Sequence, residues 1–303
     1  MQIIDTHTHI YSPDERRYPP AKELLTEGWT GKPMSRPLRP PGGKAALEDL
    51  RRESQSAGVA AACIIQTSTF YRFDNSYICD AARSNPDWTA GVCTLDPDSP
   101  DSPSVLLHDT KVYGLRGLRS IPGTTGLDSD GVRALWKAAA DLGIVVNVLI
   151  SWTDSKGGWY WGENHLPGFH RMAKEFSGLP VVLDHCLNIQ AGRPETNAAL
   201  AGLQAVAKHK NVYAKMSWVA AGSKEPYPCR DTHSLCYKII EAFGPERCVW
   251  GSAYPSSLWT PKLGYRDHLK IFTEELDLTS KVREAVLGGT ARGLWFKDSR
   301  LPV

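Results

Sequence analysis

The sequence predicts an α/β chain that closes into a (β/α)8 barrel, also called a TIM barrel. Three observations predict it: eight short apolar runs are spread along 303 residues, most of them are continuous rather than alternating, and helical stretches separate them. Continuous apolar runs are typical of parallel strands buried on both faces. Eight strand–helix units close a barrel in one domain of this length. We therefore expect residues 1–303 to form a single barrel domain.

The apolar runs are the expected strands. They begin directly at the N-terminus and continue almost to the end of the chain. We place them at Gln2–Asp5, Ala61–Thr67, Ala90–Leu95, Gly114–Arg119, Ile144–Ile150, Pro180–Asp184, Asn211–Met216 and Arg247–Gly251. Their order along the chain, with helices between them, predicts a parallel arrangement.

Helical stretches fall between these strands. The pair Asn85-Pro86 stops one of them, and Gly143 follows another as a C′ glycine would. The segment Asp96–Val112, after the third strand, is at most a weak helix. We expect helices at Ala45–Ala57, Ser76–Ser84, Ser129–Leu142, Gly168–Phe176, Thr196–Lys208 and Ser234–Phe243.

Two segments do not fit the repeat. Tyr11–Gly43 is rich in Pro and Gly and follows the first strand, and Ser151–Pro167 follows the fifth and contains four aromatic residues, Trp152 among them. Both belong at the C-terminal face of a barrel, where active sites lie. Long loops at that face commonly act as lids or pocket walls. We therefore expect Trp152 to line a pocket, with irregular packing over the rim as the alternative.

Composition and charge exclude several classes of partner. Apolar residues make up 42% of the chain and charged residues 22%, and the net charge is +2. This balance gives no support for binding to nucleic acid or a membrane surface, and no apolar stretch is long enough to span a bilayer. Seven scattered cysteines without a Cys-x-x-Cys pair, together with the absence of a visible signal peptide, favour a cytoplasmic protein with reduced thiols.

The first strand runs into two histidines, His7 and His9. Residues i and i+2 of a strand point to the same face, so both imidazoles project together. Two convergent imidazoles bind a metal or polarise a carbonyl without one. A strand end with two solvated histidines is the alternative, and the barrel context disfavours it.

Further polar residues stand at or near the ends of other expected strands. Arg116 and Arg119 are three positions apart and face opposite sides of the fourth strand, so only Arg119, nearer the C-terminal end, should enter a site directly. Both arginines are candidates to hold a substrate carboxylate, because a guanidinium matches it bidentately. Asp184 holds an imidazole or caps a loop. The other candidates are His185 as a polar group of the site, Asn147 and Lys215 as substrate-binding groups, and Tyr254 and Trp218 as pocket walls.

This constellation resembles the amidohydrolase superfamily, and specifically the branch of small sugar-lactone and dicarboxylate-lactone hydrolases, decarboxylases and a lactone isomerase. The resemblance covers essentially the whole chain and implies a distorted barrel. The residues that carry it are Ile4-Asp5-Thr6-His7-Thr8-His9, Val182-Leu183-Asp184-His185, Phe243-Gly244-Pro245-Glu246-Arg247, Trp250-Gly251-Ser252 with Tyr254-Pro255, and Leu287-Gly288-Gly289-Thr290-Ala291-Arg292.

One position departs from the family pattern. In the family the eighth strand ends in Trp-Gly-Ser-Asp-x-Pro, and that Asp is the general base that activates water. This chain has Ala253 there, and a methyl group neither accepts a proton nor binds a cation. We favour an introduced Asp→Ala substitution that traps substrate; a natural non-catalytic protein and a natural variant with another base are the alternatives.

The resemblance does not decide whether the site requires a metal ion. Metal-dependent members of the superfamily use His-x-His, histidines on the fifth and sixth strands, and the Asp on the eighth. This chain has Asn147 on the fifth strand, so the candidate ligands of a zinc ion are His7, His9 and His185. Lactonases of this branch also work without metal, with histidines and an arginine polarising the carbonyl. We lean towards no required metal.

The resemblance implies a hydrolase that opens a small lactone or related cyclic ester, carboxylated or aromatic. An Asp at position 253 would activate water, and His7, His9 and His185 would stabilise the oxyanion. The alternatives are a metal-dependent decarboxylase of an aromatic acid, a cyclic amide hydrolase and a non-catalytic binding protein. The partner is then a small-molecule substrate, and self-association into a homo-oligomer is a further expectation, as is common for such barrels.

Overall fold

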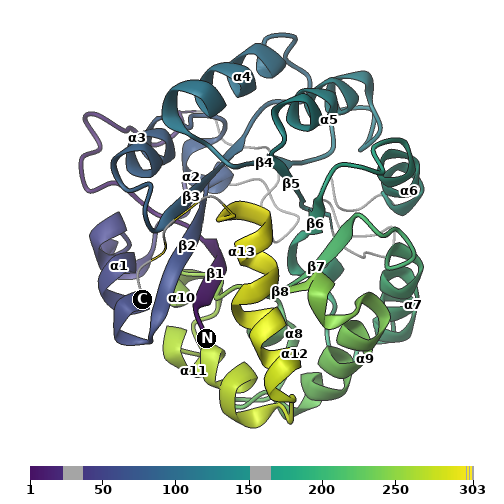
Figure 1. The fold of residues 1–303 in the computed structure, drawn as a ribbon. Helices are drawn as coiled ribbons and strands as arrows, with labels where there is room; N and C mark the ends of the chain where they lie inside the picture. The colour runs from purple at the N-terminus through teal and green to yellow at the C-terminus, as the bar shows by residue number, and fades with distance from the viewer. Residues whose placement is uncertain (23–36, 151–164, 298, 300, 302–303) are drawn as a thin grey trace.

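The fold was obtained as a computed structural model, which describes residues 1–22, 37–150, 165–297, 299 and 301. Eight parallel strands run in sequence order around a nearly closed barrel (Figure 1), which confirms the predicted fold class. Every expected strand is present, and the first extends three residues beyond its predicted end. The strands are β1 (Ile3–Thr8), β2 (Val59–Ile65), β3 (Thr89–Thr94), β4 (Gly117–Ser120), β5 (Val145–Val148), β6 (Val181–Leu183), β7 (Val212–Met216) and β8 (Cys248–Trp250).

Helices surround the strands on the outside of the barrel (Figure 1). All six expected helices are present, with ends within a few residues of the prediction. The helices are α1 (Leu47–Ser56), α2 (Ser68–Tyr71), α3 (Ser76–Ser84), α4 (Ser102–Tyr113), α5 (Asp130–Leu142), α6 (Leu166–Glu175), α7 (Thr196–Val206), α8 (Val219–Gly222), α9 (His233–Phe243), α10 (Ser256–Trp259), α11 (Tyr265–Lys270), α12 (Ser280–Glu284) and α13 (Thr290–Trp295).

The prediction of at most a weak helix after the third strand was wrong. α4 is a regular helix of 12 residues, ended by Gly114 with a φ of +72°. Its apolar residues do not form one buried stripe, because Leu106 is buried while Val105 and Leu107 on either side of it are exposed. The periodicity that indicates a helix is therefore weak here, and Gly114 was the better signal.

The barrel closes between β1 and β8 through a buried carboxylate rather than a regular ladder. Asp5 Oδ1 accepts hydrogen bonds from the backbone N–H of His7, at 3.0 Å, and of Ser252, at 2.9 Å. An isolated parallel bridge pairs Thr8 with Tyr254. Burial raises the pKa of Asp5 in spite of these bonds. This irregular seam distorts the barrel and places the end of β8 beside the two histidines.

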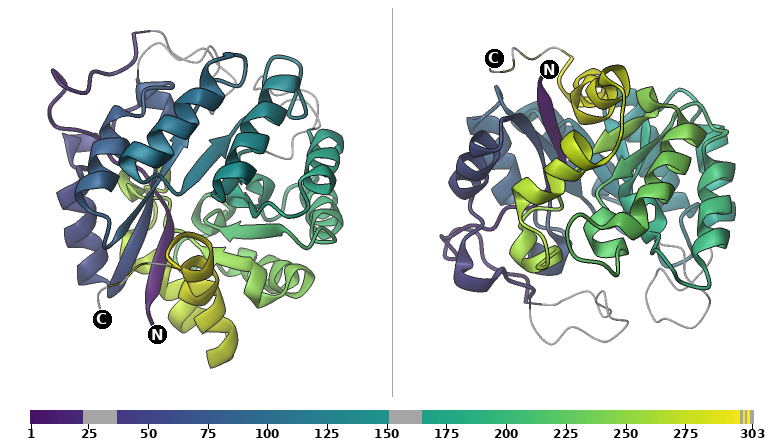
Figure 2. Two further views of the ribbon diagram at one scale, coloured as in Figure 1. Left: turned by 45° about the horizontal axis from the view of Figure 1, so that its top comes forward. Right: turned by 90° about the horizontal axis from the view of Figure 1, so that it is seen from below.

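The last helix plugs one end of the barrel. α13 lies across that end, and the N-terminus lies at the same end (Figures 1 and 2). Trp295 and Phe296 pack there against buried residues of the strands, such as Ile4 and Val249. Gly288, in the π-helical turn before α13, comes so close to β1 that a Cβ would lie 1.8 Å from the Gln2 carbonyl oxygen.

Cysteine pairing and helix length are two further properties of the described residues. All seven cysteines are free and buried, as expected for reduced thiols, while a cytoplasmic location stays a prediction. Among the described residues, the structure has no helix with the length and apolar character needed to cross a bilayer.

The π-helical turn before α13 packs closely against the start of β1. Substitutions of its two adjacent glycines should therefore have unequal effects on stability. Gly288→Ala should lower the free energy of unfolding by about 1–3 kcal/mol, because its methyl group collides with backbone. Gly289→Ala is the matched control: its Cβ would lie 3.4 Å from the nearest atom, so stability should hold or rise by up to about 1 kcal/mol. Urea unfolding measures both, and equal effects would contradict the prediction.

Candidate functional site

The two histidines of the first strand converge, as their spacing predicts. His7 Nε2 lies 3.2 Å from His9 Nε2, and the two rings are perpendicular, with centroids 4.9 Å apart. His9 Nδ1 lies 2.9 Å from the carbonyl oxygen of Ile65 at the end of β2. Both side chains are buried. The pair therefore points into the barrel and not into solvent.

A left-handed turn brings in the third histidine. His185, Cys186, Leu187 and Asn188 follow β6 with φ values from +46° to +59°. Side-chain-bearing residues in this conformation cost about 1–2 kcal/mol each, and such strain concentrates at functional sites. The turn places the ring of His185 4.3 Å from that of His7, centroid to centroid. Ser217 Oγ, beyond the end of β7, lies 2.9 Å from His185 Nδ1.

Asp184 is the centre of the cluster. Its Oδ1 lies 2.7 Å from Lys215 Nζ and accepts a hydrogen bond of 3.2 Å from Asn147 Nδ2. Its Oδ2 lies 3.8 Å from Arg119 Nε and 3.9 Å from His7 Nδ1. All of these side chains are buried. One carboxylate thus gathers polar groups from β1, β4, β5 and β7.

Burial and the neighbouring cations set the protonation of the cluster. Burial favours a raised pKa for Asp184, but Lys215 and Arg119 outweigh it and hold that pKa below its ordinary value. Burial lowers the pKa of both His9 and His185 to about 3, with Arg119 adding to the effect. The pKa of His7 is also well below its ordinary value, mainly through burial. At neutral pH the site holds three neutral imidazoles, one carboxylate and two cationic side chains.

Ala253 lies next to this cluster. It is buried and directly precedes Tyr254, whose carbonyl accepts a hydrogen bond of 2.9 Å from the backbone N–H of His9. Its φ is +56°, a conformation in which Asn, Asp and Gly are far more common than Ala. Position 253, where the resemblance implies a base, is therefore close to the histidines and has a backbone suited to an aspartate.

The structure places the two predicted arginines apart. Arg119 points into the cluster, whereas the Arg116 guanidinium donates to the Trp295 carbonyl at 2.9 Å and to Ser299 Oγ at 2.6 Å. The prediction that Arg116 binds substrate therefore lacks support, because Arg116 precedes β4 and its side chain is held by the C-terminal segment.

The aromatic candidates are distributed unevenly. Trp218 and Tyr254 are buried just beyond the ends of β7 and β8, and the Tyr254 ring packs against Tyr265 at 6.1 Å. Trp152 lies outside the described residues. The sequence analysis missed Trp259 of α10, whose ring lies 5.7 Å from that of His9. Its position shortly after β8 was the only signal for it.

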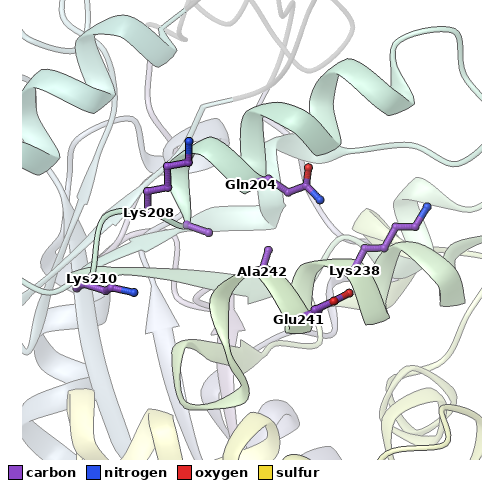
Figure 3. Close-up of a pocket in the computed structure, with 7 residues that line it drawn as sticks. Gln204, Lys208, Lys210, Lys238, Glu241 and Ala242 are labelled. Carbon is purple, nitrogen blue, oxygen red and sulfur yellow. The ribbon is translucent and has the colours of Figure 1, made fainter.

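A separate hollow of about 440 Å³ lies on the outer helical layer (Figure 3). It lies between α7 and α9, close to the start of β7 rather than its C-terminal end. The hollow is therefore not part of the histidine cluster. Its lining consists of Gln204, Ala207, Lys208, Lys210, Lys238, Glu241 and Ala242.

The described residues do not fit a metal centre as they are placed. None of their His, Cys, Asp and Glu side chains form a group of three that could hold a metal ion. The one carboxylate among the imidazoles, Asp184, is already paired with Lys215, and Ala253 supplies no ligand. Two cationic side chains also oppose the entry of another cation.

Comparison with known proteins identifies the family to which this chain belongs. The sequence model of the amidohydrolase family matches residues 4–297, so the chain belongs to that family. The L-fucono-1,5-lactonase of Burkholderia ambifaria is 26% identical over 219 residues, which cover 69% of this chain and 70% of that protein. The D-galactarolactone isomerase of Agrobacterium fabrum is 24% identical over 272 residues, 88% of this chain and 81% of that protein.

Solved structures show the same fold. A Pseudomonas putida protein assigned as a 2-pyrone-4,6-dicarboxylic acid hydrolase superposes with a TM-score of 0.75 at 21% identity, over 97% of each chain. An amidohydrolase from Burkholderia multivorans with bound zinc superposes with a TM-score of 0.68 at 20% identity, over 100% of each chain. A 2,6-dihydroxybenzoate decarboxylase from Rhizobium superposes with a TM-score of 0.66 at 13% identity, over 98% of this chain and 99% of that one.

Acid should weaken folding through the buried histidines. The pKa of His185 is about 3 in the folded protein, against an ordinary value of 6.5. Between these values the unfolded chain binds more protons, so the free energy of unfolding falls as the pH drops below 6.5. Urea unfolding of His185→Gln should show a shallower fall, by up to about 1.4 kcal/mol per pH unit. A fall as steep as in the unaltered chain would contradict this.

Proposed function

We propose that this barrel serves the hydrolysis of a small lactone or related cyclic ester, carboxylated or aromatic. The observation that carries the proposal is the meeting of three neutral imidazoles with Arg119 and Lys215 beside position 253. Neutral imidazoles and fixed cations stabilise an oxyanion that develops on a carbonyl oxygen. The family membership and the relatives named for lactones support this substrate class.

The chemistry follows from the arrangement once an aspartate stands at position 253. The aspartate takes a proton from water, and the water oxygen attacks the lactone carbonyl carbon. The oxyanion that forms is stabilised by N–H donors of the imidazole cluster. The ring C–O bond then breaks, and the leaving ring oxygen receives the proton held by the aspartate. The Arg119 guanidinium holds a substrate carboxylate.

The present chain is, in this proposal, an inactivated Asp→Ala form. Ala253 has a left-handed backbone that suits aspartate better than alanine. The histidines, Arg119 and Asp184 remain gathered next to it. Loss of a general base lowers the rate by about 10²–10⁴-fold, while substrate binding should persist.

Restoring the base tests the function. Ala253→Asp should open at least one lactone in a panel of carboxylated, aromatic and sugar lactones, about 10²–10⁴-fold faster than the unaltered chain. Ala253→Asn is the matched control, since Asn also accepts a left-handed backbone but is not a base. Product formation is measured through the acid that ring opening releases. A folded Ala253→Asp that opens no lactone would contradict the proposal.

The same assay separates the alternatives. We expect lactone opening to persist in the presence of a chelator, because the described residues do not fit a metal. Carbon dioxide released from an aromatic acid only with added zinc would instead identify a decarboxylase. Opening of cyclic amides but not of lactones would identify a cyclic amide hydrolase, and binding without turnover in Ala253→Asp would identify a binding protein.

Arg119 should decide the preference for carboxylated substrates. In the Ala253→Asp background, Arg119→Lys should raise KM for carboxylated lactones by about 10- to 100-fold, because a bidentate charged hydrogen-bond pair is lost. Lactones without a carboxylate should be much less affected. Arg116→Lys is the control, since Arg116 binds the C-terminal segment instead. Equal effects of Arg119→Lys on both kinds of lactone would refute this role.

A further inference from the structure

The hydrogen atom between His7 and His9 can be assigned from the far side of His9. His9 Nδ1 lies 2.9 Å from the carbonyl oxygen of Ile65, and a carbonyl only accepts, so Nδ1 carries the hydrogen. In a neutral imidazole the other nitrogen is then bare. The Nε2 atoms of His7 and His9 are 3.2 Å apart, and the hydrogen between them therefore belongs to His7.

The contacts on the far side of His7 favour the same assignment. Lys215 Nζ lies 3.5 Å from His7 Nδ1 and 2.7 Å from Asp184 Oδ1. A lysine ammonium has three donors and no acceptor. It is compatible with a bare His7 Nδ1, whereas a hydrogen on Nδ1 would point at the positive charge. Both ends of the chain of contacts thus favour His7 with its hydrogen on Nε2.

We propose that Lys215 is a positioning residue that keeps His7 as an Nε2–H donor, and that His7 and His9 therefore have opposite roles. His7 donates to the carbonyl oxygen of the substrate, which replaces His9 as its acceptor. The bare His9 Nε2 accepts a hydrogen bond from the attacking water. The roles towards the lactone rest on the function proposed above, but the tautomers themselves do not depend on any substrate.

The same arrangement explains why the site does not fit a metal. Two ligating histidines need bare nitrogens on the side where they meet, and here that side of His7 carries the hydrogen. The other tautomer would need an acceptor at His7 Nδ1, and Asp184 Oδ2 lies 3.9 Å from it. A carboxylate in that place is what orients metal-binding histidines. Lys215 Nζ lies close to both His7 Nδ1 and Asp184 Oδ1. It therefore favours the tautomer in which His7 Nε2 carries the hydrogen and donates it.

Nitrogen NMR of the protein labelled with ¹⁵N-histidine tests the assignment directly. In the unaltered chain we expect the hydrogen on Nε2 of His7 and on Nδ1 of His9, with His7→Gln and His9→Gln used to assign the signals. In Lys215→Met the hydrogen of His7 should move to Nδ1. Lys215→Arg, which keeps a cationic donor, should preserve the Nε2–H form. Ser217→Ala, which alters only the contact to His185, should leave His7 unchanged.

Zinc titration of the same proteins gives a second readout. Lys215→Met should bind zinc at least tenfold more tightly than the unaltered chain, measured by calorimetry with zinc chloride. Equal zinc affinities, or an unchanged His7 tautomer in Lys215→Met, would overturn the role of Lys215. A hydrogen on His7 Nδ1 in the unaltered chain would overturn the proposal even if no Lys215 variant folds. Failure of lactone turnover in Ala253→Asp would concern the proposed function alone.

Discussion

The site depends on one buried ion pair, Lys215 with Asp184. A charge this deep in a protein is costly unless it is paired, and removal of one partner of such a pair typically costs 3–5 kcal/mol. Here Asn147 and Arg119 also face the carboxylate, so the pair links neighbouring strands across the barrel interior. Lys215 Nζ also lies 5.7 Å from the ring centroid of Trp295. The plug at one end of the barrel and the polar cluster are therefore in contact through this lysine.

The same contacts that close the barrel also place the histidines. Asp5 joins β1 to the residues after β8 through the backbone of His7 and Ser252. Gly251 makes this possible, because a Cβ there would lie 2.7 Å from the Cβ of His7. A change in the seam would therefore move the imidazoles as well. This gives a physical reason for the glycine and the carboxylate in motifs that flank the site.

Family membership and the buried cluster both support the class of chemistry proposed above, and the proposal gives position 253 the decisive role. The amidohydrolase family match covers nearly the whole chain, and the imidazoles, Arg119 and Asp184 are assembled in a buried interior. Such an interior strengthens hydrogen bonds to a developing oxyanion. In the proposed function Ala253 leaves the site without a base, at a position where the left-handed backbone accommodates an aspartate. In the function proposed above, substrate recognition and proton removal therefore rest on different residues.

Local sequence patterns determined the barrel, because continuous apolar runs and helix-ending residues act over a few neighbours. The i, i+2 spacing also determined that His7 and His9 converge, whereas the expectation of a base at position 253 came from the resemblance to a known family. The tertiary structure alone decided that Asp184 is the centre of the cluster, since its partners come from strands far apart in sequence. It also decided the left-handed turn that presents His185. Distances across a barrel are set by closure of the whole sheet, which no local pattern of residues encodes.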